Sequence, residues 1–104
     1  MTTRVMIVDD HPVYRDGLVA LIDAAADMTV VGTAGDGAEA VELVMSAVPD
    51  IVLMDLNLPS MSGVAATAAI TVRSSSPFVL AVTMVDDDDT VVAALRAGAR
   101  GYVL

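Results

Sequence analysis

Two short apolar runs in this chain each end in aspartate. Residues 5–8 read Val-Met-Ile-Val and are followed by Asp9 and Asp10, while residues 51–54 read Ile-Val-Leu-Met and are followed by Asp55. Continuous apolar runs of this length are typical of strands that are buried on both faces of a parallel sheet. Ligands of open parallel sheets bind outside the carboxyl ends of the strands. We therefore expect the three carboxylates to share one crevice.

Three carboxylates in one crevice repel one another, and a hard divalent cation held by oxygen ligands is the usual relief. Aspartate after a strand also forms turns and caps helices, and for Asp10 alone that explanation is as good as a metal site. Because Asp55 ends a second strand of the same kind, we favour a metal site over a turn or cap for Asp10. His11 follows directly in the sequence, but beside Pro12 at a helix start we expect it to be a solvated terminal residue rather than a ligand.

The rest of the chain alternates apolar runs with longer segments of helical period, which is typical of βαβ units around a parallel sheet. Pro12 fits a first helical turn, and Asp36 with Glu39 matches a capping box. Residues 55–63 contain proline and glycine and are predicted to form a loop. We expect strands at residues 4–8, 28–34, 51–54, 78–83 and from about 101, and helices at 12–25, between Asp36 and Pro49, at 64–73 and at 88–97.

Composition limits the class of protein. The length is that of a single domain, and the absence of cysteine excludes disulfides and thiolate zinc sites, which fits a reducing cytoplasm. The net charge of −9 argues against binding to nucleic acid phosphates. Residues 56–72 are uncharged but contain Pro59 and Gly63, and the amino terminus enters a strand at once, so we expect neither a membrane span nor a signal peptide.

Four motifs carry a family resemblance. They are Val-Asp-Asp-His-Pro at 8–12, Leu-Met-Asp-Leu-Asn-Leu-Pro at 53–59, Thr-Met at 83–84 with the acids that follow, and Ala-Gly-Ala-Arg-Gly-Tyr at 97–102. In this order and spacing, residues 4–104 resemble the receiver domain of a two-component response regulator of the NarL/LuxR type. The resemblance implies an α/β, flavodoxin-like (CheY-like) three-layer sandwich with a five-stranded parallel sheet in the order 2-1-3-4-5. Periodicity alone does not give that order.

The same resemblance implies a phosphorylation site that depends on Mg²⁺. The residue matching Asp55 accepts a phosphoryl group from a histidine kinase, and those matching Asp9 and Asp10 organise the metal. The residue matching Asn57 gives its backbone carbonyl to Mg²⁺. Each role is chemically reasonable, because a carboxylate is a weak nucleophile toward phosphorus and needs the developing charge neutralised. We expect Asp9 to reach the metal through water, since Mg²⁺ keeps several of its waters.

The resemblance also implies a switch. The residue matching Thr83 hydrogen-bonds the phosphoryl oxygen, and the one matching Tyr102 changes rotamer. A hydroxyl at the end of strand four has the reach to cross the crevice, and drawing it inward would move the loop that follows. Asp86 to Asp89 run from that loop into the helix predicted at 88–97, and as a charge run entering a helix we expect them to be solvated rather than a second cation site.

Two features depart from the family pattern. The family has a lysine soon after the aromatic residue of strand five, where it pairs with the phosphoryl group, but this chain has no lysine. The final helix of the family is also absent from residues 1–104. We therefore expect a C-terminally incomplete receiver that is phosphorylated slowly, exposes the apolar side of strands four and five and self-associates. The resemblance further implies a helix-turn-helix DNA-binding domain beyond residue 104.

Two other functions remain open at this point. A phosphatase of the haloacid dehalogenase type also forms an aspartyl phosphate at a strand end, but it places a general acid two residues later, where this chain has Asn57. A receiver fold used only for dimerisation would keep the acids without being phosphorylated. The resemblance favours a phosphoacceptor that is not an enzyme. Its expected partners are a sensor histidine kinase and further copies of itself, with DNA contacted only through the second domain and no membrane contact.

Overall fold

A single parallel sheet organises the molecule. The computed structural model describes residues 2–59, 61–73, 77–82 and 88–103. The strand order is β2-β1-β3-β4-β5, which confirms the predicted topology. The strands are β1 (Thr3–Val8), β2 (Met28–Ala34), β3 (Ile51–Asp55), β4 (Phe78–Val82) and β5 (Gly101–Val103), and the helices are α1 (Pro12–Ala24), α2 (Gly37–Ala47), α3 (Gly63–Arg73) and α4 (Asp88–Ala97).

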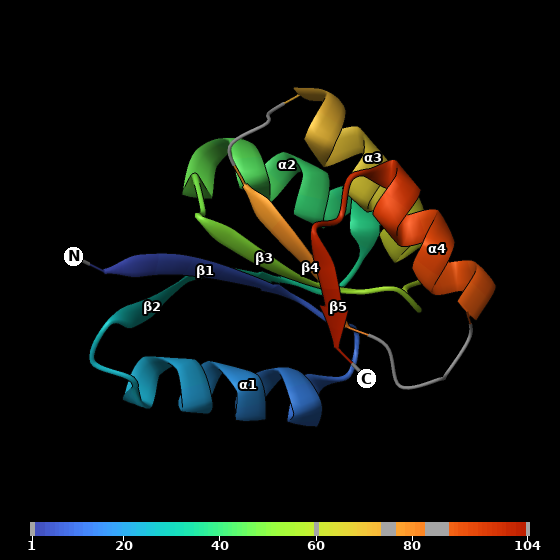
Figure 1. The fold of residues 1–104 in the computed structure, drawn as a ribbon. Helices are drawn as coiled ribbons and strands as arrows, with labels where there is room; N and C mark the ends of the chain where they lie inside the picture. Colours follow the sequence, from blue (N-terminus) through green and yellow to red (C-terminus); the bar gives the residue numbers. More distant parts are fainter. Residues whose placement is uncertain (1, 60, 74–76, 83–87, 104) are drawn as a thin grey trace.

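The helices cover the two faces of the sheet unequally. Figure 1 shows α2, α3 and α4 on one face and α1 alone on the other. The main core lies on the three-helix face, where alternate residues of the central strands meet the apolar sides of the helices. Among its fully buried members are Met6, Val52, Met54, Ile70 and Val79. This packing fixes the central strands, and it is at their carboxyl ends that the acidic residues follow.

The face covered by α1 is more open. The structure describes α1 over its whole length, and none of its residues is buried. Leu21 is 71% exposed, although its position in the helical period predicted a core contact. Phe78 and Val103 lie on the outer strands and are 38% and 46% exposed. Side chains on β4 alternate, so the neighbours of the buried Val79 point to this open face.

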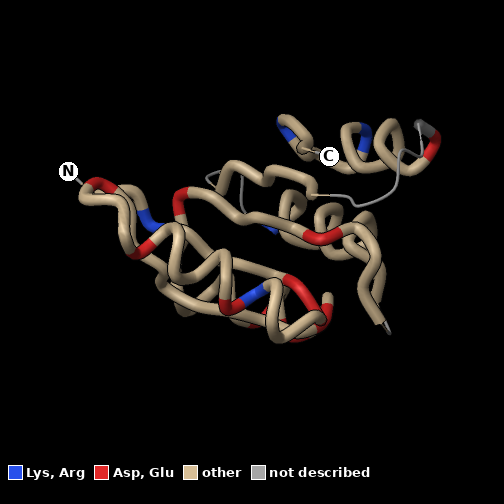
Figure 2. The backbone as a smooth tube through the Cα atoms, turned by 90° about the horizontal axis from the view of Figure 1, so that it is seen from below, with Lys and Arg blue, Asp and Glu red and all other residues tan. Residues whose placement is uncertain are grey.

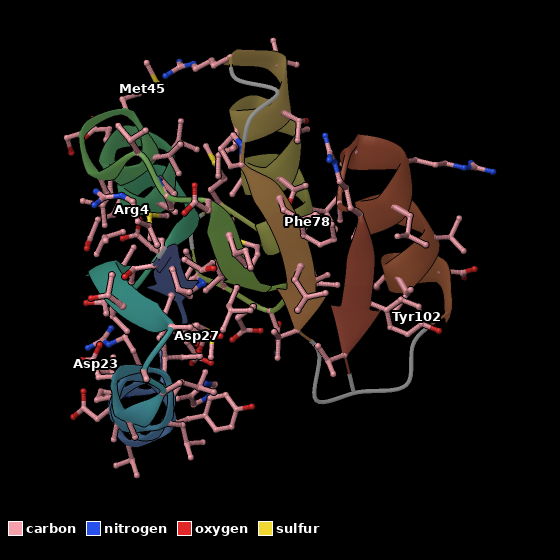
Figure 3. The ribbon with its side chains drawn as sticks, turned by 60° about the vertical axis from the view of Figure 1, so that its left-hand side comes forward. Arg4, Asp23, Asp27, Met45, Phe78 and Tyr102 are labelled. Carbon is pink, nitrogen blue, oxygen red and sulfur yellow. The ribbon has the colours of Figure 1, made fainter. Side chains whose placement is uncertain are left out.

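The side chain of Arg4 on β1 ties the carboxyl end of α2 to the sheet. Arg4 on β1 donates from Nε to the carbonyl oxygen of Val48 at 3.2 Å and from Nη2 to that of Ala47 at 2.6 Å (Figure 3). These carbonyls have no partner within the helix, because the last turn leaves them free. At the other end, the Asp36 carboxylate accepts the backbone N–H of Glu39 at 2.8 Å, which confirms the predicted cap.

The predicted boundaries were wrong in two places near the acidic residues. Gly63 was assigned to a loop but is the first residue of α3. Asp55 was expected to follow β3 but is its last residue, because its backbone still pairs with Val82 of β4. The prediction that Gly98 ends α4 is confirmed, with a φ of 122° that favours glycine. Boundaries depend on tertiary hydrogen bonds, which periodicity does not encode.

The basic residues are spread thinly over the molecule. All five are arginines, all are described, and they lie on β1, α1, α3, α4 and the turn after α4. Figure 2 shows them as separate blue positions on a chain that carries more acidic ones. They form no basic stripe of the kind that grips nucleic acid phosphates. Among the described residues, no helix has the length and apolar character needed to cross a membrane.

Candidate functional site

The ends of β1 and β3 bring the predicted carboxylates together. The two strands are neighbours, and their register pairs Val8 with Met54. The residues that follow, Asp9 and Asp55, therefore emerge level with each other. One ligand atom from each of Asp9, Asp10, His11 and Asp55 can be chosen so that all four atoms lie within 4.8 Å of one another. The predicted group of carboxylates is present, and it also includes an imidazole.

Asp9 is the most firmly held member of this group. Its residue is 4% exposed, its N–H donates to the carbonyl oxygen of Ala34 at 3.0 Å, and its own carbonyl oxygen accepts Nη1 of Arg15 at 3.1 Å. Its Oδ1 accepts the N–H of His11 at 2.8 Å. Asp9 thus forms the turn that starts α1 and also contributes its charge to the group of carboxylates.

Asp10 presents an oxygen atom that lacks a hydrogen-bond donor. Its Oδ1 is buried, and among the described residues it has no hydrogen-bond partner. The Nδ1 of His11 lies 3.1 Å away, but the two atoms do not form a hydrogen bond in this geometry. A buried acceptor without a donor is costly unless a cation meets it. The residues present therefore fit an oxygen-liganded divalent cation in this position.

Asp55 is the last residue of β3 and is 6% exposed. Its Oδ1 accepts the N–H of Asn57 at 2.9 Å, which fixes the orientation of the carboxylate. Burial raises the pKa of Asp55 above its usual value, the charges of Asp9 and Asp10 raise it further, and the Asn57 N–H opposes the shift. The ionised carboxylate is destabilised here, and a cation in the crevice would relieve that cost.

His11 would carry the complementary charge when its imidazole is protonated. Its side chain is 65% exposed, and its Nδ1 lies 3.2 Å from Oδ1 of Asp9. The hydrogen bond to Asp9 raises the pKa of His11, and the charge of Asp10 adds to the effect. The sequence prediction of a solvated residue at the helix start is right about exposure but missed these contacts. Its position directly after two aspartates was the available signal.

The comparisons with known proteins agree with this geometry. The family described as response regulator receiver domain matches residues 5–104. The chain belongs to this family. Among curated relatives of this receiver, the transcriptional regulatory protein LiaR of Bacillus subtilis (strain 168) is 42% identical over 101 residues, which are 97% of this chain and 48% of that protein. The nitrate/nitrite response regulator protein NarL of Escherichia coli (strain K12) is 39% identical over 100 residues, which are 96% of this chain and 46% of that protein.

Solved receiver structures give the same result. A LuxR-family two-component response regulator from Aurantimonas sp. SI85-9A1 superposes with a TM-score of 0.92 at 40% identity, covering 98% of this chain and 73% of that one. The signal receiver domain of NarL from Mycobacterium tuberculosis gives a TM-score of 0.92 at 37% identity, covering 97% and 82%. The chain spans about half the length of the two curated relatives above.

Three further residues, Asn57, Thr83 and Tyr102, were predicted to take part in the receiver site. Asn57 is exposed, and its backbone N–H holds Asp55, while the role of its carbonyl stays a prediction. Thr83 lies outside the described residues. Tyr102 pairs with Ala81 across β4 and β5 and is 50% exposed. Figure 3 shows it on β5, at the edge of the sheet.

Two residues that support the receiver site were not predicted. A Cβ added to Gly63 would overlap the carbonyl oxygen of Asp55 and lie 2.6 Å from Cα of Leu56. The amino end of α3 therefore packs directly on the backbone of the central aspartate. Arg15 holds the backbone of Asp9 from α1. Neither contact has a local sequence signal, because each joins segments whose contact only the folded chain creates.

Proposed function

We propose that this receiver is a phosphoacceptor, with Asp55 as the residue that takes the phosphoryl group from a phosphohistidine of a sensor histidine kinase. The observation that carries the proposal is the group of three carboxylates from two neighbouring strand ends. Two of these residues, Asp9 and Asp55, are buried, and Asp10 presents an oxygen without a donor. Like charges that crowd one another are stabilised when a cation balances them.

The side chains are arranged for nucleophilic attack. The N–H of Asn57 holds one oxygen of Asp55, and no hydrogen bond to the other, Oδ2, is formed by any described residue. Oδ2 would form the new bond to phosphorus as the bond from phosphorus to the kinase imidazole breaks, in line with it. Mg²⁺, when bound, would supply positive charge that neutralises the charge developing during the transfer. Asp10, Asp55 and the backbone carbonyl of Asn57 would hold it directly, and Asp9 through water.

The same proposal extends to signalling. Thr83 would hydrogen-bond the phosphoryl oxygen and Tyr102 would change rotamer, so that phosphorylation becomes a change of shape near β5. Relatives named as transcriptional regulators support a role in transcription, with DNA contacted by a domain outside residues 1–104. We further propose that phosphorylation alters dimerisation, that the protein works in the cytoplasm, where the kinase transfers its phosphoryl group, and that it is not itself an enzyme with a separate substrate.

Intact-mass spectrometry tests the proposal. The chain and its Asp55→Asn variant are incubated with acetyl phosphate or phosphoramidate, with and without Mg²⁺. We expect a gain of one phosphoryl group that requires both Mg²⁺ and Asp55. The Asp16→Asn variant, which removes an exposed carboxylate on α1, should behave like the original chain.

Other outcomes would contradict it. A gain that persists in Asp55→Asn would place the phosphoryl group elsewhere. The absence of any gain would favour the alternative of a receiver fold that serves only for interaction. In that case sedimentation should show the same association with and without the phosphodonor.

A further inference from the structure

The N–H of Asn57 orients the carboxylate of Asp55, so whatever fixes Asn57 also fixes the proposed phosphoacceptor. Asn57 is exposed, and burial of its own side chain does not hold it. Its neighbour Leu56 is held from two sides. The N–H of Leu56 donates to the carbonyl oxygen of Val82 at 3.1 Å, and its carbonyl oxygen accepts the N–H of Gly63 at 3.2 Å. Asn57 is therefore positioned by the backbone around it.

Met61 joins this backbone to the amino end of α2. Its N–H donates to the carbonyl oxygen of Pro59 at 2.7 Å, which closes a turn, and its side chain is partly buried against the core. The helices α2 and α3 lie side by side on one face of the sheet (Figure 1). Because each follows the carboxyl end of a parallel strand, both begin at the edge where Asp55 lies. Gly37, the first residue of α2, meets Met61 there.

Gly37 leaves no room for a side chain between α2 and the turn at Met61. A Cβ added to Gly37 would lie 2.5 Å from the carbonyl oxygen of Met61 and 2.9 Å from its Cβ. A separation below 3.0 Å is not tolerated, so the carbonyl oxygen would have to retreat by about 0.5 Å. The atom in the way belongs to the backbone, and no change of rotamer relieves the overlap.

The first turn of α2 is firmly fixed. The carboxylate of Asp36 accepts the N–H of Glu39 at 2.8 Å, and the carbonyl oxygen of Asp36 accepts the N–H of Ala40 at 3.1 Å. Ala40 is fully buried, and Val41 is 8% exposed. An extra methyl group at position 37 would therefore displace the turn at Met61 rather than the helix.

We propose that Gly37 is a positioning residue for phosphorylation: it lets α2 press directly on Met61, and this contact sets the place of the Asn57 N–H. The link runs along the chain from Met61 to Gly63, whose N–H holds Leu56, the neighbour of Asn57. Gly37 acts on the phosphoacceptor only through this backbone. The effect on phosphorylation rests on the proposed function, whereas the placement of Asn57 does not.

Gly37→Ala tests the proposal, with Gly32→Ala as its matched control. A Cβ added to Gly32 would also come within 3.0 Å of an atom of α2, because it would lie 2.9 Å from Cδ2 of Leu43. That atom is the end of a flexible side chain, which can move aside. The two substitutions add the same group against the same helix, and only Gly37→Ala meets the backbone at Met61.

Two measurements are made on each protein. Mass spectrometry after incubation with phosphoramidate and Mg²⁺ gives the rate of phosphorylation. Nuclear magnetic resonance of the ¹⁵N-labelled protein gives the amide resonance of Asn57 and its rate of exchange with solvent. Urea denaturation followed by circular dichroism confirms that each variant is folded under these conditions.

The expected results separate positioning from stability. Gly37→Ala should lower the rate of phosphorylation by roughly tenfold, since a misplacement of about 1 Å costs about 100-fold. The amide proton of Asn57 should move to lower chemical shift and exchange faster, because its hydrogen bond to Asp55 weakens. Gly32→Ala should keep both values close to those of the original chain. A merely structural role of Gly37 would lower the free energy of unfolding and leave the Asn57 amide unmoved.

Met61→Ala provides a second variant in case Gly37→Ala does not fold. It removes side-chain atoms that lie near Gly37 and adds none. The turn is then held less closely against α2. The Asn57 amide should exchange faster, and the rate of phosphorylation should fall, both by less than in Gly37→Ala.

Contrary results would overturn the proposal. An unchanged Asn57 amide in a folded Gly37→Ala variant would do so, as would a rate of phosphorylation equal to that of the original chain. Equal effects of Gly32→Ala and Gly37→Ala would assign the change to α2 as a whole and would have the same force. If Gly37→Ala does not fold, an unchanged Asn57 amide in Met61→Ala decides against the proposal. If the original chain takes no phosphoryl group, the proposed function fails, while a displaced Asn57 amide in Gly37→Ala still supports the contact.

Discussion

Asp55→Asn should stabilise the fold when no divalent cation is present. Burial and the charges of Asp9 and Asp10 raise the pKa of Asp55, so the folded protein holds this carboxylate ionised at a cost. Two unit charges 4.8 Å apart, the outer limit of the cluster, repel by about 3.5 kcal/mol at an effective dielectric constant of about 20. His11 and the N–H of Asn57 offset part of that cost.

Removing the charge of Asp55 should therefore raise the free energy of unfolding by about 1–2 kcal/mol. For a domain of this size, each kcal/mol raises Tm by about 4–8 °C. Urea denaturation followed by circular dichroism, in the presence of a chelator, measures the free energy of unfolding. Asp16→Asn serves as the control, because an exposed surface substitution changes stability by less than about 0.5 kcal/mol.

The pH dependence follows from the direction of the shift. The folded protein keeps the proton on Asp55 to a higher pH than the unfolded chain, so the cost is fully present above the folded pKa. It disappears as the pH falls below 3.8, the ordinary value for this group. The difference in stability between Asp55→Asn and the original chain should therefore shrink in acid. A variant that is equal to or less stable than the original chain at neutral pH in chelator would refute the reasoning.

Binding of Mg²⁺ should make the original chain more stable than Asp55→Asn. A ligand that binds only the folded state at 100 times its dissociation constant stabilises it by about 2.7 kcal/mol. Mg²⁺ at that level should raise the stability of the original chain by this amount. The same concentration should stabilise Asp55→Asn less, because one carboxylate ligand is lost. An equal effect on both proteins would mean that Mg²⁺ does not contact Asp55.

Three further predictions concern other contacts. Gly63→Ala should destabilise the fold by about 2 kcal/mol or more in urea denaturation, because its Cβ would overlap a carbonyl oxygen at the end of β3. Gly17→Ala, where nothing lies within 4 Å, should stabilise it by about 0.5–1 kcal/mol, and the opposite order would contradict the packing. Arg4→Met should cost about 1–3 kcal/mol by the same assay, since two carbonyl oxygens at the end of α2 lose their donor. In the metal-free protein the imidazole of His11 should titrate above 6.5 by nuclear magnetic resonance, and Asp9→Asn should lower that value, because Asp9 is the largest cause of the shift. An unchanged pKa of His11 in Asp9→Asn would mean that another group raises it.

The sequence could predict the residues that end the central strands. The apolar runs before Asp9 and Asp55 are local, and local runs report burial on both faces of a sheet. The same holds for Pro12 at the start of α1 and for Asp36 at the start of α2, which the structure confirms. Carboxylates at neighbouring strand ends repel one another, and a bound cation relieves that repulsion. The sequence therefore also predicted a cation site. The candidate site was predictable for these reasons.

The supporting contacts could not be predicted in this way. Gly63 was judged by its own conformational freedom, whereas its role comes from the backbone of Asp55, against which it packs. Nothing in the local sequence distinguishes Arg15, and its contact with the carbonyl of Asp9 depends on how α1 docks. Leu21 fits the apolar stripe of a helix but is mostly exposed, because α1 alone covers its face of the sheet.

The sequence by itself determined which residues carry the chemistry, the alternation of strands and helices, and through its motifs the family. Only the tertiary structure decided how the side chains meet. The pairing of Val8 with Met54 makes Asp9 and Asp55 level, and the docking of α1 brings Arg15 to the carbonyl oxygen of Asp9. Local patterns report burial and backbone preference, which depend on near neighbours in the chain. Distances within 4.8 Å between residues about 45 positions apart, such as Asp9 and Asp55, depend on strand register and helix packing, which exist only in the folded molecule.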